Sequence, residues 1–281
     1  MRPILCATDF SARSEPAIAR ARLLASQFGA ELVMVHVLDE DLPAALRDNH
    51  RASVEAMVAD AAGKAGARWR LETGDVYEAL LAAAEAEGAG LIVLGAPRRN
   101  LLRALFSGTT AGRVIRHSGL PVLMAAQPGA APYQRMLLAA DFSAGAKRAA
   151  ETLRDLGLAK GAKLTVLNVF DAPAMQALTQ AQTPQADIAA YLLEERIRAT
   201  ALLDGFIAEA GLAGADPMLK LAQASTSRVI LAAAKEAGAD LIVMGTRGQS
   251  GLTRFLLGSV TEEVLRASEI DVLAVPPAQG A

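Results

Sequence analysis

The sequence has a single cysteine, few aromatic residues and no excess of basic charge. Cys6 alone cannot form an internal disulfide, which is typical of proteins that work in a reducing compartment. The 28 lysines and arginines are outnumbered by 30 aspartates and glutamates, so the composition gives no support for a nucleic-acid-binding surface. No apolar run approaches the roughly 18 residues that a membrane helix needs, and Asp9 comes too early for a secretory signal. We therefore expect a cytosolic globular protein.

Two copies of one unit make up the chain. The stretch 4–11 recurs as 137–143, with Asp9 matched to Asp141, and the stretch 89–95 recurs as 239–245. A proline- and glycine-rich linker at 127–132 separates the copies. We expect two domains, at residues 1–128 and 133–281.

Apolar strands alternate with helical patterns in each copy, which predicts an α/β fold. In the first copy, strands are predicted near 3–8, 31–37, 68–72, 91–95 and 121–125, and helices near 14–28, 45–64, 76–87 and 110–117. We expect two repeated doubly wound parallel five-stranded sheets, each with strand order 3-2-1-4-5. The second copy places its third strand at 218–222. It also carries extra residues around 172–188, which we interpret as an exposed loop and a helix extension, with a lid over the site as the alternative.

A glycine-rich loop follows the fourth strand of the second copy. The buried strand 241–244 leads into glycines at 245, 248, 251 and 258. Ser259 then precedes Glu262 at capping-box spacing, which predicts that Ser259 caps a helix. Backbone N–H groups of such a loop and helix start can bind phosphate, although a plain tight turn is the alternative. The loop is not a P-loop, because no lysine follows a loop glycine and the nearest basic groups are Arg247 and Arg254.

Asp141 ends the first strand of the second copy, while Gly245 ends the fourth. In the expected strand order these strands are neighbours, and ligands of doubly wound sheets bind where the chain winds away from such a pair. We therefore expect Asp141 and the glycine loop to face one crevice. Capping of the next helix, by Asp141 or by Ser143, is the alternative role.

The motif Gly245-x2-Gly248-x9-Gly258-Ser259, with an Asp closing the first strand and a Val closing the second, resembles the universal stress protein family in its tandem form. The resemblance covers nearly the whole chain. It implies an adenine-nucleotide alpha-hydrolase-like fold and, as in some members, ATP binding with metal-bridged phosphates, for which Mg²⁺ is the candidate metal. It also implies an internal pseudo-dimer paired through the strands 120–125 and 270–275. The implied contacts are Asp141 and Val169 on the nucleoside, Met244 and Gly245 on its adenosine side, and Gly248, Gly258, Ser259 and Val260 on phosphate, with Arg247 beside them.

The first copy departs from this motif. It keeps Asp9, Val37, Gly95, Gly108 and Thr109 at the matching positions. However, Arg98 stands where the second copy has Gly248, and Pro97 precedes it. Arginine and proline restrict the backbone where close approach is needed, so we expect a lost or weakened nucleotide site. Phosphate contacts from the side chains of Arg98 and Arg99 are the alternative.

The residues outside this motif indicate no catalytic centre. His36, His50 and His117 share no metal-ligand spacing, and no Ser/His/Asp or Cys/His set recurs in both copies. The leading hypothesis is an ATP-binding stress-response protein that acts as a switch or carrier. The alternatives are slow Mg²⁺-dependent hydrolysis or phosphoryl transfer, and an interaction scaffold that binds no nucleotide. Two chains associating into a homodimer is a further expectation.

Overall fold

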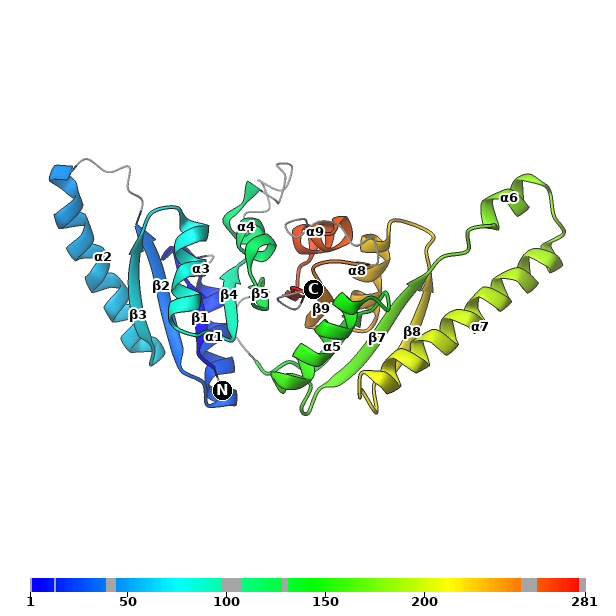
Figure 1. The fold of residues 1–281 in the computed structure, drawn as a ribbon, viewed down its shortest axis with the longest axis horizontal. Coiled ribbons are helices and arrows are strands. Elements are labelled where there is room, and N and C mark those ends of the chain that lie inside the picture. The colour runs from blue at the N-terminus through cyan, green and yellow to red at the C-terminus, as the bar shows by residue number, and fades with distance from the viewer. Residues whose placement is uncertain are drawn as a thin grey trace.

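The two copies share one continuous β-sheet. The computed structural model describes residues 2–12, 14–38, 44–97, 108–127, 131–248 and 257–277. Within them, ten strands follow the order β3-β2-β1-β4-β5-β10-β9-β6-β7-β8. Neighbouring strands are parallel, apart from the antiparallel pair β5 and β10 at the centre. The α/β class and the order 3-2-1-4-5 within each copy are confirmed, and the two sheets are joined edge to edge (Figure 1).

Each copy alternates strand and helix much as its sequence pattern predicts. The first copy contains β1 Ile4–Ala7, α1 Glu15–Phe28, β2 Leu32–Leu38, α2 Ala44–Ala65, β3 Arg68–Thr73, α3 Val76–Ala86, β4 Leu91–Gly95, α4 Thr110–His117 and β5 Val122–Ala125. The second contains β6 Arg135–Ala139, α5 Ala144–Asp155, β7 Lys163–Phe170, α6 Met175–Gln180, α7 Gln185–Glu209, β8 Asp216–Leu221, α8 Thr226–Glu236, β9 Leu241–Gly245, α9 Ser259–Ala267 and β10 Asp271–Val275. The third strand of the second copy thus begins two residues before its predicted start.

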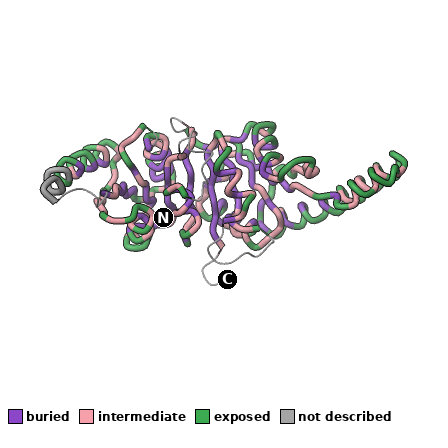
Figure 2. Tube along the Cα trace, turned by 90° about the horizontal axis from the view of Figure 1, so that it is seen from above, coloured by how far each residue is buried: buried purple, intermediate pink, exposed green. Residues whose placement is uncertain are grey.

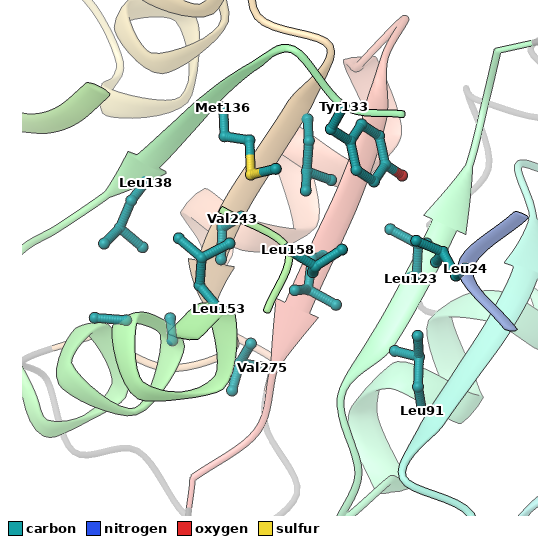
Figure 3. Packing of buried hydrophobic residues seen from close by; sticks show 14 of the residues in the cluster. Leu24, Leu91, Leu123, Tyr133, Met136, Leu138, Leu153, Leu158, Val243 and Val275 are labelled. Carbon is teal, nitrogen blue, oxygen red and sulfur yellow. The ribbon is translucent and has the colours of Figure 1, made fainter. Parts of the chain in front are cut away.

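Two hydrophobic layers lie on opposite faces of the sheet. The central strands are apolar on both faces, as parallel strands covered by helices on both sides must be. One layer packs α1 and α5 against the sheet and runs across both copies, from Leu24 and Leu123 to Leu153 (Figure 3). The other lies under α3, α4, α8 and α9. Buried residues accordingly concentrate in the sheet (Figure 2).

The last strand of each copy pairs with the last strand of the other copy. Leu123 of β5 lies opposite Leu273 of β10, and both side chains are buried. Strands that would otherwise be exposed sheet edges are therefore covered, which confirms the expected pseudo-dimer. Cys6 lies in β1 with no exposed surface, and burial raises the pKa of its thiol to about 12, so the thiol is chemically inert in the folded chain.

A buried ionic cluster contacts the chain on both sides of residues 128–130, between the copies. Asp271, which is fully buried, accepts a hydrogen bond from the Nε of Arg20 at 2.9 Å and from the Tyr133 hydroxyl at 2.7 Å. Its other oxygen accepts from the backbone N–H of Ala126 at 2.8 Å. Arg20 also donates to the carbonyl of Ala131 and lies 4.1 Å from the Tyr133 ring centre. Burial, aided by Asp271, raises the pKa of Tyr133 well above its ordinary value, so Tyr133 remains a donor.

The extra segment of the second copy forms a helical arm. Residues 172–188 contain α6 and the first turn of α7, a helix of 25 residues whose N-terminal part projects beyond the sheet with α6 (Figure 1). The expectation of an exposed helix extension is confirmed. The alternative of a lid is not supported, because no residue of this segment lines the cavity at the carboxyl ends of β6 and β9, where the glycine loop begins.

Candidate functional site

A cavity of about 180 Å³ opens at the carboxyl ends of β6 and β9. These strands are direct neighbours, with Ala139 of β6 opposite Met244 of β9. The cavity therefore lies at the point where the chain winds away in opposite directions. All nine residues predicted for the second copy line it, namely Asp141, Val169, Met244, Gly245, Arg247, Gly248, Gly258, Ser259 and Val260. Val169 comes from the end of β7, and Thr226 and Ile230 of α8 also line the cavity.

The Asp141 carboxylate is held by the turn that follows it. Its Oδ1 accepts hydrogen bonds from the backbone N–H of Ser143 at 3.1 Å and from the Ser143 hydroxyl at 2.6 Å. Phe142 between them adopts a left-handed backbone with φ of 62°, which is strained for a residue with a side chain. Ser143 caps α5 by accepting from the N–H of Ala146. Of the two alternatives, Ser143 is therefore the helix cap, and Asp141 orients Ser143.

Three glycines let the walls of the crevice approach closely. A Cβ atom on Gly145 would lie 2.4 Å from the carbonyl oxygen of Arg247. One on Gly245 would lie 2.8 Å from the backbone of Gly145, so β9 and α5 meet backbone to backbone. A Cβ on Gly248 would lie 2.6 Å from the Oδ2 of Asp141. The glycine loop and Asp141, far apart in sequence, thus meet directly in one crevice.

The N-terminus of α9 borders the cavity. The N-cap residue is Gly258, which has no side chain to cap the helix. The expectation that Ser259 caps it through a capping box with Glu262 is wrong, because Ser259 is the first helical residue. Gly258 is instead anchored by its N–H, which donates to the carbonyl of Thr246 at 2.9 Å. The first-turn N–H groups therefore keep the partial positive charge of a helix start next to the cavity.

The matching crevice of the first copy is wider. Its cavity of about 680 Å³ is lined by all five residues predicted there, Asp9, Val37, Gly95, Gly108 and Thr109. Pro97 also lines it, whereas Arg98 and Arg99 lie outside the described residues. Here the helix start is closed, because the Thr109 hydroxyl accepts from the N–H of Gly112 at 3.1 Å and caps α4.

His36 and Asn168 occupy matching places on the second strand of each copy. The Nδ1 of His36 lies 2.8 Å from the carbonyl oxygen of Thr8, and the Asn168 amide donates to that of Ala140 at 2.8 Å. Each side chain thus supports the end of the neighbouring first strand in its own copy. Among the described residues, no group of three or more His, Cys, Asp or Glu side chains has a metal-binding arrangement.

Sequence reasoning missed Gly145 and the Arg20–Asp271 pair. Gly145 stands in the first turn of a helix where the first copy has Arg13, and this difference was the available signal for a close approach. Arg20 and Asp271 are 251 residues apart and have no matching pair in the second copy, so the duplication could not reveal them.

A family model for the universal stress protein family matches residues 1–126 and again 132–276. The chain belongs to the universal stress protein family. A putative universal stress protein of Staphylococcus aureus strain USA300 is 34% identical over 147 residues, which are 51% of this chain and 84% of the relative. One from Staphylococcus haemolyticus is 30% identical over 145 residues, with the same shares of each chain. Each of these relatives thus matches about half of the tandem.

Solved universal stress proteins share the full two-copy fold. A crystal structure from Archaeoglobus fulgidus aligns with a TM-score of 0.69 at 20% identity, covering 99% of this chain and 97% of the other. A putative universal stress protein from Pseudomonas aeruginosa aligns with a TM-score of 0.65 at 22% identity, covering 99% and 94%. At these identities the likeness concerns the fold. In the parts of this chain that the structure describes, no helix is long and apolar enough to cross a membrane.

Proposed function

We propose that this universal stress protein binds ATP in the crevice of its second copy and acts as a nucleotide-dependent switch or carrier. The observation that carries the proposal is the N-terminus of α9, whose N-cap is a glycine and which borders the same cavity as Asp141 and Gly248. N–H groups at a helix start favour phosphate, and the carboxylate in the same cavity can accept hydrogen bonds from ribose or base. Arg247, which also lines the cavity, adds a cation for phosphate.

Binding requires the crevice to open. Its volume of about 180 Å³ lies below the roughly 300–1,000 Å³ of ordinary ligand pockets, and Gly248 lies against Asp141. A nucleotide therefore has to separate Gly248 from this carboxylate before its phosphates reach α9. Such a displacement is the kind of change through which a bound nucleotide can act as a switch. Mg²⁺ bridging the phosphates belongs to this proposal, with the metal held by the nucleotide.

The test is an ATP titration of the wild-type chain and of a Gly248→Arg variant, measured by calorimetry in Mg²⁺ buffer. The variant places the first copy's residue in the second, where even a Cβ atom meets the Asp141 carboxylate. We expect ATP affinity to fall at least tenfold, although the new charge alone would attract ATP. Gly205→Arg is the matched control, because Gly205 is exposed on α7 and a Cβ atom added there would meet nothing within 4 Å.

Equal ATP affinity of the wild type and the Gly248→Arg variant would contradict the site. Absence of ATP binding to the wild type, with no nucleotide co-purifying by mass spectrometry of the denatured protein, would favour an interaction scaffold instead.

A further inference from the structure

The two halves of α7 have different surroundings. Its buried residues, Ala199, Leu203 and Phe206, all lie in the C-terminal half, and the latter two belong to the hydrophobic layer that covers the sheet. The N-terminal half projects beyond the sheet together with α6, and Figure 2 shows mostly exposed residues along it. The hydroxyl of Tyr191 in this half accepts a hydrogen bond at 3.1 Å from the N–H of Ala174, the N-cap of α6. The helical arm, formed by α6 and residues 185–198 of α7, is thus held to the chain mainly through α7 itself.

An apolar stripe runs along one side of the helical arm. Its members follow one another at spacings of four, three and four residues, which place them on one face of a helix. This outer stripe consists of Ala186, Ala190, Leu193 and Ile197, all of which are exposed. Leu193 and Ile197 expose 58% and 59% of their surface, whereas the large apolar residues described outside α7 expose at most 49%. Continued at the same spacing, the stripe reaches Thr200 and Asp204, so its apolar part is confined to the arm.

The pattern of the outer stripe is that of a helix that packs against another helix. Alternating steps of three and four residues form the seam through which two helices lie side by side. A helix that faces only water carries polar residues on its outer side, so large exposed leucine and isoleucine side chains there indicate an interaction surface. The two alanines nearer the tip allow the backbone of a second helix to come close.

The charges beside the outer stripe fit a second copy of the same helix running in the opposite direction. Glu194 and Arg198 lie four residues apart on the same side of the stripe. If Leu193 of one copy faces Ile197 of the other, Glu194 of each copy comes level with Arg198 of the other. Arg198 also donates to Glu195 of its own helix at 2.9 Å, but a guanidinium has several N–H donors and can serve both carboxylates.

A second copy of the chain also has to use a surface other than the central strands. β5 and β10 pair with each other inside the chain, with Leu123 opposite Leu273, so neither is an open sheet edge. A twofold axis through two arms instead brings the same surface of both chains together, as an isologous dimer requires.

We propose that a second copy of this chain docks on the outer stripe, so that two helical arms pair antiparallel about a twofold axis near Glu195. The Leu193 and Ile197 side chains of the two copies cover each other, and Glu194 of each arm pairs with Arg198 of the other. Both cavities stay accessible in such a dimer, because no residue of the helical arm lines either of them.

Sedimentation equilibrium of the full chain, up to submillimolar concentration, tests the proposal. Leu193→Glu places a charge in the seam, and Leu202→Glu is the matched control. The two leucines expose 58% and 60% of their surface, but Leu202 lies nine residues further on, about two and a half turns, and so points to the opposite side of α7. We expect the wild type and Leu202→Glu to dimerise equally, and the dissociation constant of Leu193→Glu to rise roughly tenfold or more. Circular dichroism and thermal melting check that both variants fold.

A charge exchange tests the antiparallel direction. Glu194→Arg and Arg198→Glu each place like charges opposite one another in a dimer of that variant, and each should weaken self-association several-fold. In a mixture of the two variants, every arginine at these positions meets a glutamate of the other chain. We therefore expect the mixed dimer to be tighter than either variant's own dimer.

Three results would overturn the inference. They are a wild type that stays monomeric throughout the concentration range, a Leu193→Glu variant that dimerises as the wild type does, and a mixed dimer no tighter than the two unmixed ones. Flotation with vesicles of phosphatidylcholine and phosphatidylglycerol separates the other occupant that an apolar helix face can have. A monomeric wild type that floats with these vesicles, while Leu193→Glu does not, would assign the outer stripe to a lipid surface and reject the dimer.

Discussion

The two copies of this chain share a fold and differ in the cavity at the carboxyl ends of their strands. In the second copy, Gly145, Gly245 and Gly248 allow the loop to lie against α5 and Asp141, and the crevice is narrow. In the first copy, Arg13 and Arg98 replace Gly145 and Gly248, and the crevice is wide. The lack of side chains at Gly145, Gly245 and Gly248 thus lets neighbouring segments approach closely in the second copy.

The copies also differ at their junction, where the largest effect is expected. Asp271 of the second copy contacts Arg20, while the matching position of the first copy is Pro121 and that of Arg20 is Thr152. Asp271→Ala leaves Arg20 buried without a counter-charge, and we expect the free energy of unfolding to fall by about 3–5 kcal/mol. Urea unfolding measures this change.

The control for this prediction is Asp216→Ala. Asp216 forms an exposed ion pair with Lys163 at 2.8 Å, and we expect its loss to change stability by less than about 1 kcal/mol. Similar effects of the two substitutions would mean that the buried cluster does not fix the junction.

The Gly145→Ala substitution tests whether α5 and the segment after β9 approach as closely as the narrow crevice requires. Alanine normally stabilises a helix relative to glycine by about 0.5–1 kcal/mol, but here the new Cβ would lie 2.4 Å from the Arg247 carbonyl. We expect a net destabilisation of about 1–3 kcal/mol, because the backbones have to separate. Thermal and urea unfolding report it.

The Gly205→Ala substitution is expected to change the stability of the chain in the opposite direction. Gly205 lies within α7 with open space around it, so the same replacement should stabilise the chain by about 0.5–1 kcal/mol. If both variants were stabilised, the close approach at Gly145 would be refuted.

A comparably small effect is expected at the two helix starts. Thr109→Ala removes the cap of α4 and should lower stability by about 1 kcal/mol, whereas Ser259→Ala removes no cap and should have almost no effect. Chemical denaturation of the two variants side by side measures the difference. Equal losses would show that α9 is capped as α4 is.

The fold was predictable from sequence because its signals are local and repeated. Apolar runs such as Leu241–Gly245 mark buried strands, and the duplication supports each element twice. The same repetition placed Asp141 and the glycine loop in one crevice, since strand order in a doubly wound sheet brings these strand ends together.

Distances between elements could not be predicted in the same way. The sequence gives Ser259 and Glu262 the spacing of a capping box, yet tertiary anchoring of Gly258 by Thr246 starts the helix one residue earlier than that motif requires. Likewise, the narrow crevice of the second copy involves a contact between α5 and the segment after β9, at Gly145 and Arg247, which are about a hundred residues apart in the sequence.

The most direct test of the central claim, that the second copy binds ATP between Asp141 and the glycine loop, is native mass spectrometry of the wild-type chain with ATP and Mg²⁺. We predict one ATP per chain, which is lost in Gly248→Arg and kept in Gly205→Arg. Two ATP molecules per chain, or one ATP still bound to the Gly248→Arg variant, would contradict this claim.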